Sequence, residues 1–176
     1  TAQGGIIDKA LAGIGLDVPV GPLVEVFRSH RPERLEPYPA VVGGLARLAR
    51  TVPLGLVTDG DPGIQRGKLA ALGLVPFFRA VVYSDDLGRQ RRKPDPAPFL
   101  AALGMLGVPA GSVVFVGDNP AKDVAGAAAL GMTTIRVRTG EYAEAEGPVP
   151  ADHDVASVAD ALEVLDTVFR SRPVVV

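Results

Sequence analysis

Acidic and hydroxyl side chains follow three apolar runs of the sequence, at the point where each run ends. They are Thr58 and Asp59 after the first run, Ser84 to Asp86 after the second, and Asp118 and Asn119 after the third. Because the carboxyl ends of parallel strands meet at one edge of a sheet, we expect these groups to face a single ligand site. Carboxylates without His or Cys suit Mg²⁺, which takes one or two carboxylates together with waters and a phosphate oxygen. The pattern therefore predicts a magnesium-assisted phosphate site.

A further carboxylate, Asp123, follows in the stretch GDNPAKD. If a helix begins near Pro120, Asp123 lies in its first turn and can point back toward the space beside Asp118. It would then bind the metal or orient another group. The alternative is that Asp123 only complements the positive end of the helix dipole.

A positive partner for the phosphate is offered by Lys93 in the stretch QRRKPDP. A lysine is a compact point charge, and the prolines after it restrict the backbone on either side of Asp95. The restricted backbone can therefore hold the Lys93 ammonium beside a bound phosphate. The alternative is that Lys93 is a surface lysine in a turn. The neighbouring Arg91 and Arg92 are expected to be replaceable with little effect on an intact enzyme.

Short β-branched runs alternate with segments of helical spacing along most of the chain. The predicted strands are 53–57, 80–83, 113–117 and 133–137, and the predicted helices are 62–74, 96–107, 121–131 and 157–169. This alternation predicts the α/β class, with a Rossmann-like three-layer architecture in which a parallel sheet has helices on both faces.

The first part of the chain differs, because residues 6–16 and 21–30 look like two helices with no strand before or between them. A proline-rich link, 31–39, follows. We therefore expect the remainder of a small helical cap over residues 1–37, a core domain over 38–170 and a C-terminal tail over 171–176.

Composition excludes several classes of protein. The chain has 176 residues, 47% of them apolar, a formal charge of −2 and no cysteine, so disulfides and thiolate metal sites are ruled out. No apolar run approaches the ~20 residues of a membrane span, and the densest basic stretch, 89–93, is typical of a solvated loop. We expect a cytoplasmic protein with neither a nucleic-acid nor a membrane partner, whose oligomeric state the sequence leaves open.

Together the motifs resemble the haloacid dehalogenase-like (HAD) hydrolases, which are mainly magnesium-dependent phosphatases. LVTDG is similar to the family's second motif, RRKPDP to the third and VFVGDNPAKD to the fourth, and the resemblance spans roughly residues 5–165. It implies two catalytic residues, Thr58 on the transferring phosphoryl group and Lys93 on the negative charge of nucleophile and phosphate. It implies Asp118 and Asp123 as the metal site. The implied phosphate-binding residues are Thr58, Asp59, Lys93 and Asn119.

The family's first motif, Asp-x-Asp-x-Thr/Val, has no counterpart in the sequence. Asp8 and Asp17 each stand alone, without a preceding strand or an acidic partner two residues later. In the family that strand lies between the strands ending here at Thr58 and Asp118, so we expect a gap in the sheet. We further expect that the motif lies in a segment upstream of Thr1, and that residues 1–176 alone fold poorly and lack phosphatase activity.

The resemblance thus implies a phosphatase of small phosphorylated metabolites, acting through an aspartyl-phosphate whose nucleophile lies outside the sequence. The alternatives are a non-catalytic HAD-like binding domain and a metal-independent haloacid dehalogenase. A P-loop is excluded at residues 60–69, because Gly63 and Gly67 are one residue too close and Leu69 replaces the required Ser or Thr.

Overall fold

The computed structural model describes residues 5–16, 18–29 and 32–171. The chain divides into two compact units, residues 1–33 and 34–176. The first unit contains α1 (Gly5–Gly13) and α2 (Val20–Ser29), which contact each other. Asp8 lies in α1, and Asp17 lies outside the described residues. Two helices were predicted here, and their membership of a cap stays a prediction.

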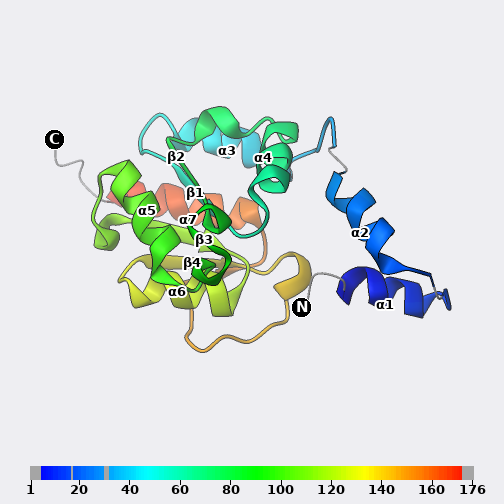
Figure 1. Ribbon diagram of the computed structural model, residues 1–176. Coiled ribbons are helices and arrows are strands. Elements are labelled where there is room, and N and C mark those ends of the chain that lie inside the picture. Colours follow the sequence, from blue (N-terminus) through cyan, green and yellow to red (C-terminus); the bar gives the residue numbers. More distant parts are fainter. Residues whose placement is uncertain (1–4, 17, 30–31, 172–176) are drawn as a thin grey trace. The chain divides into compact units, whose positions relative to one another are not determined.

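The second unit alternates parallel strands with helices, which confirms the predicted α/β class (Figure 1). Its strands are β1 (Gly55–Thr58), β2 (Ala80–Tyr83), β3 (Val114–Gly117), β4 (Thr133–Val137) and β5 (His153–Val155). Its α-helices are α3 (Val41–Leu48), α4 (Pro62–Ala71), α5 (Pro96–Leu106), α6 (Ala125–Ala129) and α7 (Val158–Ser171). A π-helix over Pro120–Val124 leads into α6. None of the helices in the described part of the chain is long and apolar enough to cross a membrane.

The strands form two separate sheets, with the orders β1-β2 and β3-β4-β5. All three strand pairs are parallel. Within residues 32–171, no strand joins β1 to β3, so the inner edge of each carries no strand partner. The gap expected between the strands that end at Thr58 and Asp118 is therefore confirmed for the described residues.

Two apolar clusters lie on opposite faces of the strands. One packs Leu48 of α3 and Leu165 of α7 against Ile135 of β4. The other packs Phe99 of α5 against Ala127 of α6, together with Met132 and Phe115. Successive residues of β3 alternate between the two clusters, since Val114 contacts the first and Phe115 the second. This alternation follows from the two-residue period of a strand, and it gives the predicted helix-sheet-helix layers.

An Asp-Pro pair begins both α4, which follows β1, and α5, which precedes β3. Asp61 caps α4 by accepting a hydrogen bond from the Ile64 amide at 3.0 Å, and Pro62 follows it. Asp95 caps α5 by accepting from the Ala97 amide at 2.9 Å, and Pro96 follows it. Asp at the N-cap and proline at the first helical position both favour a helix start. These caps fix the loops that carry Asp59 and Lys93.

Candidate functional site

Lys93 connects the two sheets at the carboxyl ends of their strands. Its Nζ donates to Asp123 Oδ1 at 2.7 Å and to the carbonyl oxygen of Val57 at 3.3 Å. Val57 belongs to β1, whereas Asp123 lies in the π-helix that follows β3. The ends of β1 and β3 therefore face the same point although the two strands are not paired. The basic motif and the fourth motif therefore meet there.

Asp123 is the most constrained acid of the site, with only 7% of its side chain exposed. Its second oxygen accepts a hydrogen bond from the Asn119 amide at 3.0 Å. A Cβ atom on Gly117 would lie 2.4 Å from the Asp123 Cβ, so only glycine leaves room for this carboxylate at the end of β3. The π-helix and Gly117 together place Asp123 under Lys93, and π-turns are frequent at functional sites.

Asp118 lies near Asp123 and has no cationic partner among the described ion pairs. Burial raises the pKa of Asp118 above its ordinary value, and the neighbouring Asp123 carboxylate raises it further. A cation placed here would relieve both effects. No group of three metal-ligating side chains occurs in the part of the chain that the structure describes. Two carboxylates fit Mg²⁺, which keeps several waters and uses phosphate oxygens as further ligands.

Asp59 ties together the loops after β1 and β2. Its Oδ1 accepts hydrogen bonds from Ser84 Oγ at 2.8 Å and from the Lys93 amide at 3.2 Å. Its Oδ2 is buried without a hydrogen-bond partner among the described residues, and Lys122 Nζ lies 3.8 Å away. Sequence analysis placed Ser84 at this edge of the sheet without predicting its contact with Asp59, and it gave no role to Lys122. The only signal for Ser84 was its position directly after an apolar run.

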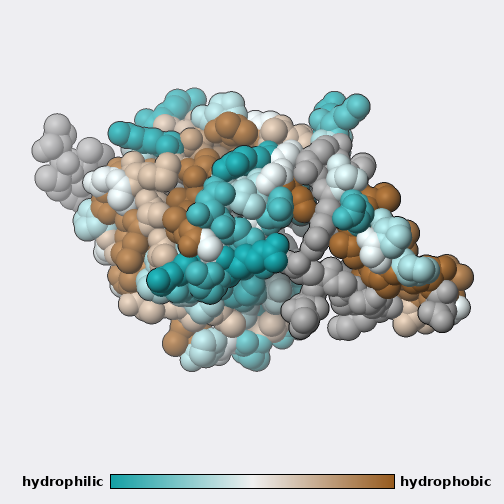
Figure 2. All heavy atoms as spheres, in the orientation of Figure 1, coloured by the Kyte–Doolittle hydropathy of each residue, from teal (hydrophilic) through white to brown (hydrophobic). Residues whose placement is uncertain are grey.

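Two further predicted residues make local contacts. Thr58 Oγ1 donates to Gln65 Oε1 at 3.3 Å. Asn119 Oδ1 accepts from the Ala121 and Lys122 amides at 3.1 and 3.0 Å, and so caps the π-helix. The phosphate contacts expected of Thr58, Asp59 and Asn119 stay predictions. Thr58 and Asp59 lie at the end of β1, and Asn119 lies at the end of β3. Figure 2 shows that hydrophilic residues gather on part of this face of the core unit.

The two arginines before Lys93 differ from each other. Arg92 forms a bidentate pair with Asp85, with 2.6 Å between Arg92 Nη2 and Asp85 Oδ2, and holds the pKa of that carboxyl below its ordinary value. The Asp85 side chain is only 6% exposed, so removing Arg92 would leave a buried carboxylate whose remaining ion pair is the longer one to Arg89, at 3.8 Å. Arg91 is exposed and lies 3.4 Å from Asp95. The expectation that both can be replaced with little effect therefore does not hold for Arg92.

Comparison with known proteins places most of the chain in one family. A family model described as haloacid dehalogenase-like hydrolase matches residues 6–131. The chain is 36% identical to glyceraldehyde 3-phosphate phosphatase of Methanopyrus kandleri over 165 residues, which are 92% of this chain and 70% of that protein. It is 40% identical to phosphoserine phosphatase of Thermus thermophilus over 119 residues, 67% of this chain and 47% of that protein. Beyond the first relative, the chain spans about half the length of the curated relatives it matches.

Solved structures of two enzyme types share the fold. An HAD phosphatase from Thermococcus onnurineus superposes with a TM-score of 0.65 at 33% identity, covering 88% of this chain and 68% of that one. A 2-haloacid dehalogenase from Pseudomonas syringae superposes with a TM-score of 0.66 at 34% identity, covering 84% and 60%. Both phosphoryl and haloacid chemistry therefore occur on similar scaffolds.

Proposed function

The chain belongs to the haloacid dehalogenase-like hydrolases, and from this premise we propose that it supplies the phosphate- and magnesium-binding part of a phosphatase for a small phosphorylated metabolite. The observation that carries the proposal is the pair of hydrogen bonds from Lys93 Nζ to Asp123 and Val57. These bonds fix one ammonium group, 12% exposed, beside two carboxylates, at the point that the carboxyl ends of β1 and β3 both face. A scaffold without a ligand has no need of this arrangement.

Each residue has a distinct role in the proposed reaction. Lys93 and Thr58 hold the oxygens of the phosphoryl group, and Asp118 and Asp123 hold Mg²⁺. When bound, Mg²⁺ neutralises phosphate charge and so favours attack on phosphorus. Asp59 positions the Lys93 backbone through its hydrogen bond to the Lys93 amide.

The resemblance implies that the nucleophile is an aspartate supplied from outside residues 1–176. Its carboxylate oxygen forms a bond to phosphorus as the bond from phosphorus to the ester oxygen breaks, and a second aspartate gives that leaving oxygen a proton. Water then attacks phosphorus and gives a proton to the second aspartate, the bond between phosphorus and the aspartate oxygen breaks, and phosphate leaves. The names of the relatives favour phosphate esters of small carbonyl and amino-acid compounds as substrates. We also propose a cytoplasmic location, which the absence of cysteine supports.

Two alternatives remain distinct from this proposal. A haloacid dehalogenase, favoured by the similar Pseudomonas syringae structure, attacks carbon and needs no metal. The adjacent acids Asp118 and Asp123 argue for a cation and thus for phosphoryl transfer. A non-catalytic HAD-like domain would bind ligands without turning them over.

Calorimetric titration with Mg²⁺, in the presence and absence of inorganic phosphate, tests the proposal. We expect phosphate to tighten Mg²⁺ binding, because phosphate oxygens complete the coordination shell. The variant Asp118→Asn should bind Mg²⁺ at least about ten-fold more weakly. Equal binding by parent and variant, or no effect of phosphate, would contradict the metal site.

A further inference from the structure

Lys122 is a second lysine at the carboxyl ends of the strands, and the proposed reaction does not use it. The chain has only four lysines against 14 arginines, and two of the four lie at this site. The Lys122 side chain is 43% exposed, and its Nζ lies 3.8 Å from Asp59 Oδ2. Lys122 belongs to the π-helix after β3, whereas Asp59 follows β1. Lys122 therefore bridges the two loops on which the proposed site is built.

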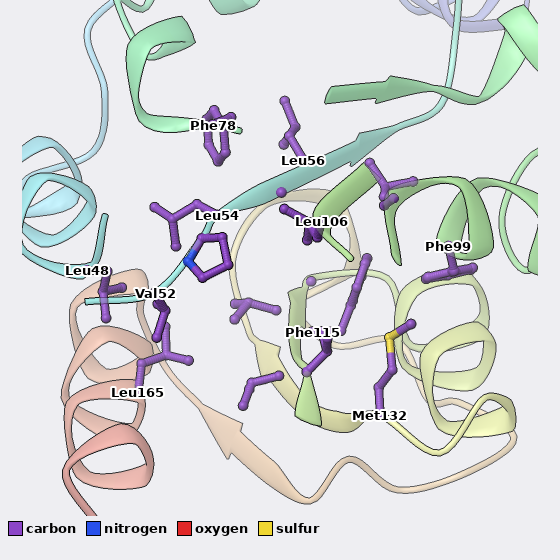
Figure 3. Close-up of a pocket in the computed structure, with 18 of the residues that line it drawn as sticks. Leu48, Val52, Leu54, Leu56, Phe78, Phe99, Leu106, Phe115, Met132 and Leu165 are labelled. Atoms are coloured by element: carbon purple, nitrogen blue, oxygen red, sulfur yellow. The ribbon is translucent and has the colours of Figure 1, made fainter. Parts of the chain in front are cut away.

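Lys122 lies outside the cavity between β1 and β3. That cavity has a volume of about 500 Å³, and mainly apolar side chains line it (Figure 3). Its charged lining residues are Lys93, Asp118 and Asp123, whereas neither Asp59 nor Lys122 lines it. The Lys122 ammonium is thus placed beside the proposed phosphate position rather than within it. A ligand that enters from solvent can reach this ammonium, because the side chain is exposed.

The contact with Asp59 does not account for the Lys122 ammonium. Its distance of 3.8 Å exceeds the roughly 2.7–3.2 Å of a hydrogen bond. Asp59 Oδ2 is accordingly a buried oxygen without a hydrogen-bond partner among the described residues. Ion pairs with an exposed member contribute little to stability. The Lys122 ammonium therefore has N–H donors free, within the described part of the chain, for an acceptor that a ligand brings.

The charge balance of the site also leaves Lys122 over. Asp59, Asp118 and Asp123 together carry three negative charges when they are ionised. Mg²⁺ and the Lys93 ammonium would supply three positive charges, and both already meet the phosphoryl oxygens in the proposed reaction. Lys122 is thus available to a second anionic group on the same ligand. A single ammonium matches the single charge of a carboxylate, and Lys122 is the only cation that pairs with Asp59 among the described ion pairs.

We propose that Lys122 is a specificity-determining residue, whose ammonium binds a carboxylate group of the substrate while Mg²⁺ and Lys93 hold the phosphate. The preferred substrates are then small phosphate esters that also carry a carboxylate, rather than esters of uncharged aldehydes, alcohols or sugars. This inference rests on the proposed function, from which it takes the position of the phosphate.

Calorimetric titration of residues 1–176 in the presence of Mg²⁺ tests the proposal with two matched probes. 2-Phosphoglycolate carries a carboxylate, and ethyl phosphate carries a methyl group in its place. We expect 2-phosphoglycolate to bind about three- to ten-fold more tightly than ethyl phosphate at low salt. This preference should shrink as salt is added, because the ammonium is exposed. Equal affinities of the parent for the two probes would overturn the proposal.

Variants of two lysines show whether Lys122 causes the preference. Lys122→Met removes the ammonium but keeps the backbone amide that donates to Asn119 Oδ1 at 3.0 Å, so the start of the π-helix should be retained. The affinity ratio of the two probes should fall to within about two-fold in Lys122→Met and in a second neutral variant, Lys122→Gln, and should persist in Lys122→Arg. Lys68→Met is the matched control, because it removes the same charge from an exposed position in the last turn of α4, and it should keep the parental ratio.

The outcomes separate this inference from the proposed function. Circular dichroism identifies the neutral variants that keep the secondary structure of the parent. A folded neutral variant with the parental ratio would refute the role of Lys122, and would make Mg²⁺ the partner of the carboxylate. Equal weakening of both probes would also refute it, because Lys122 would then act on the phosphate. Binding of ethyl phosphate without a preference for 2-phosphoglycolate would overturn this inference alone, whereas failure of both probes to bind the parent would contradict the phosphate site itself.

Discussion

The change of Gly117 to alanine tests whether one missing methyl group shapes the whole site. The added Cβ would lie 2.4 Å from the Cβ and 2.6 Å from Oδ2 of Asp123. Asp123 cannot yield without losing hydrogen bonds, because its two oxygens accept from Lys93 Nζ at 2.7 Å and from the Asn119 amide at 3.0 Å. We therefore expect Gly117→Ala to displace a buried carboxylate.

The expected loss in the free energy of unfolding of Gly117→Ala has two contributions. Overpacking of a filled site costs about 1–3 kcal/mol, and a hydrogen bond to a charged group contributes about 1.5–3 kcal/mol. If the methyl breaks one of the two bonds to Asp123, the free energy of unfolding should fall by about 2.5–6 kcal/mol. Gly104→Ala is the matched control, because a Cβ on this exposed glycine of α5 meets nothing within 4 Å. It should raise stability by about 0.5–1 kcal/mol.

Urea denaturation followed by far-ultraviolet circular dichroism measures both variants, since the sequence contains no tryptophan. In parallel, Mg²⁺ titration in the presence of phosphate should show binding weakened at least about ten-fold in Gly117→Ala and unchanged in Gly104→Ala. A Gly117→Ala variant that loses less than about 0.5 kcal/mol and binds Mg²⁺ normally would refute the account of Asp123 given above.

Four further substitutions should separate the roles of neighbouring charges. Lys93→Met keeps most of the side-chain stem but removes the ammonium, so inorganic phosphate should bind at least about ten-fold more weakly in calorimetry, and unchanged affinity would exclude Lys93 from the phosphate site. Arg92→Ala should lower the free energy of unfolding, because the buried Asp85 loses its bidentate partner, whereas Arg91→Ala should leave that free energy within about 0.5 kcal/mol of the parent in urea denaturation; equal effects would count against the buried pair. The pKa of Asp85 is lowered in the folded state, so its contribution to stability is present above its ordinary pKa and disappears as pH falls through the folded value. Stability measured from pH 5 to pH 3 should therefore decline less steeply in Asp85→Asn than in the parent, and equal slopes would contradict this.

Local patterns in the sequence were sufficient to predict most strands and helices of the core unit. The runs 80–83 and 133–137 match β2 and β4 at both ends. The predicted helix over 62–74 ends at Ala71, and the predicted strand over 53–57 begins at Gly55. These shifts lie at element ends, where local propensity is weakest and fraying is common. Apolar periodicity and cap residues act over a few positions, so they are visible without a structure.

Contacts between distant residues could not be predicted in the same way. The sequence singled out Lys93 and Asp123 separately, but their direct hydrogen bond depends on two loops that meet 30 residues apart. The π-helix over Pro120–Val124 has no sequence signature separate from an α-helix start, and it decides which way Asp123 points. The contact of Ser84 with Asp59 was not predicted for the same reason, since it spans 25 residues. Site chemistry was thus predicted by residue type, and site geometry was not.

The hydrogen bonds of Lys93 also set how it can meet a ligand. An ammonium group carries three N–H donors and no acceptor. Two of the three are committed, one to Asp123 Oδ1 and one to the Val57 carbonyl oxygen. A single donor is left for an incoming anion, and its direction is fixed by the other two because the three are arranged tetrahedrally about nitrogen. The donors of arginine are confined to one plane, so arginine cannot direct two donors to Asp123 and Val57 and a third, tetrahedrally placed donor to an anion. This explains why a chain rich in arginine places a lysine at this position.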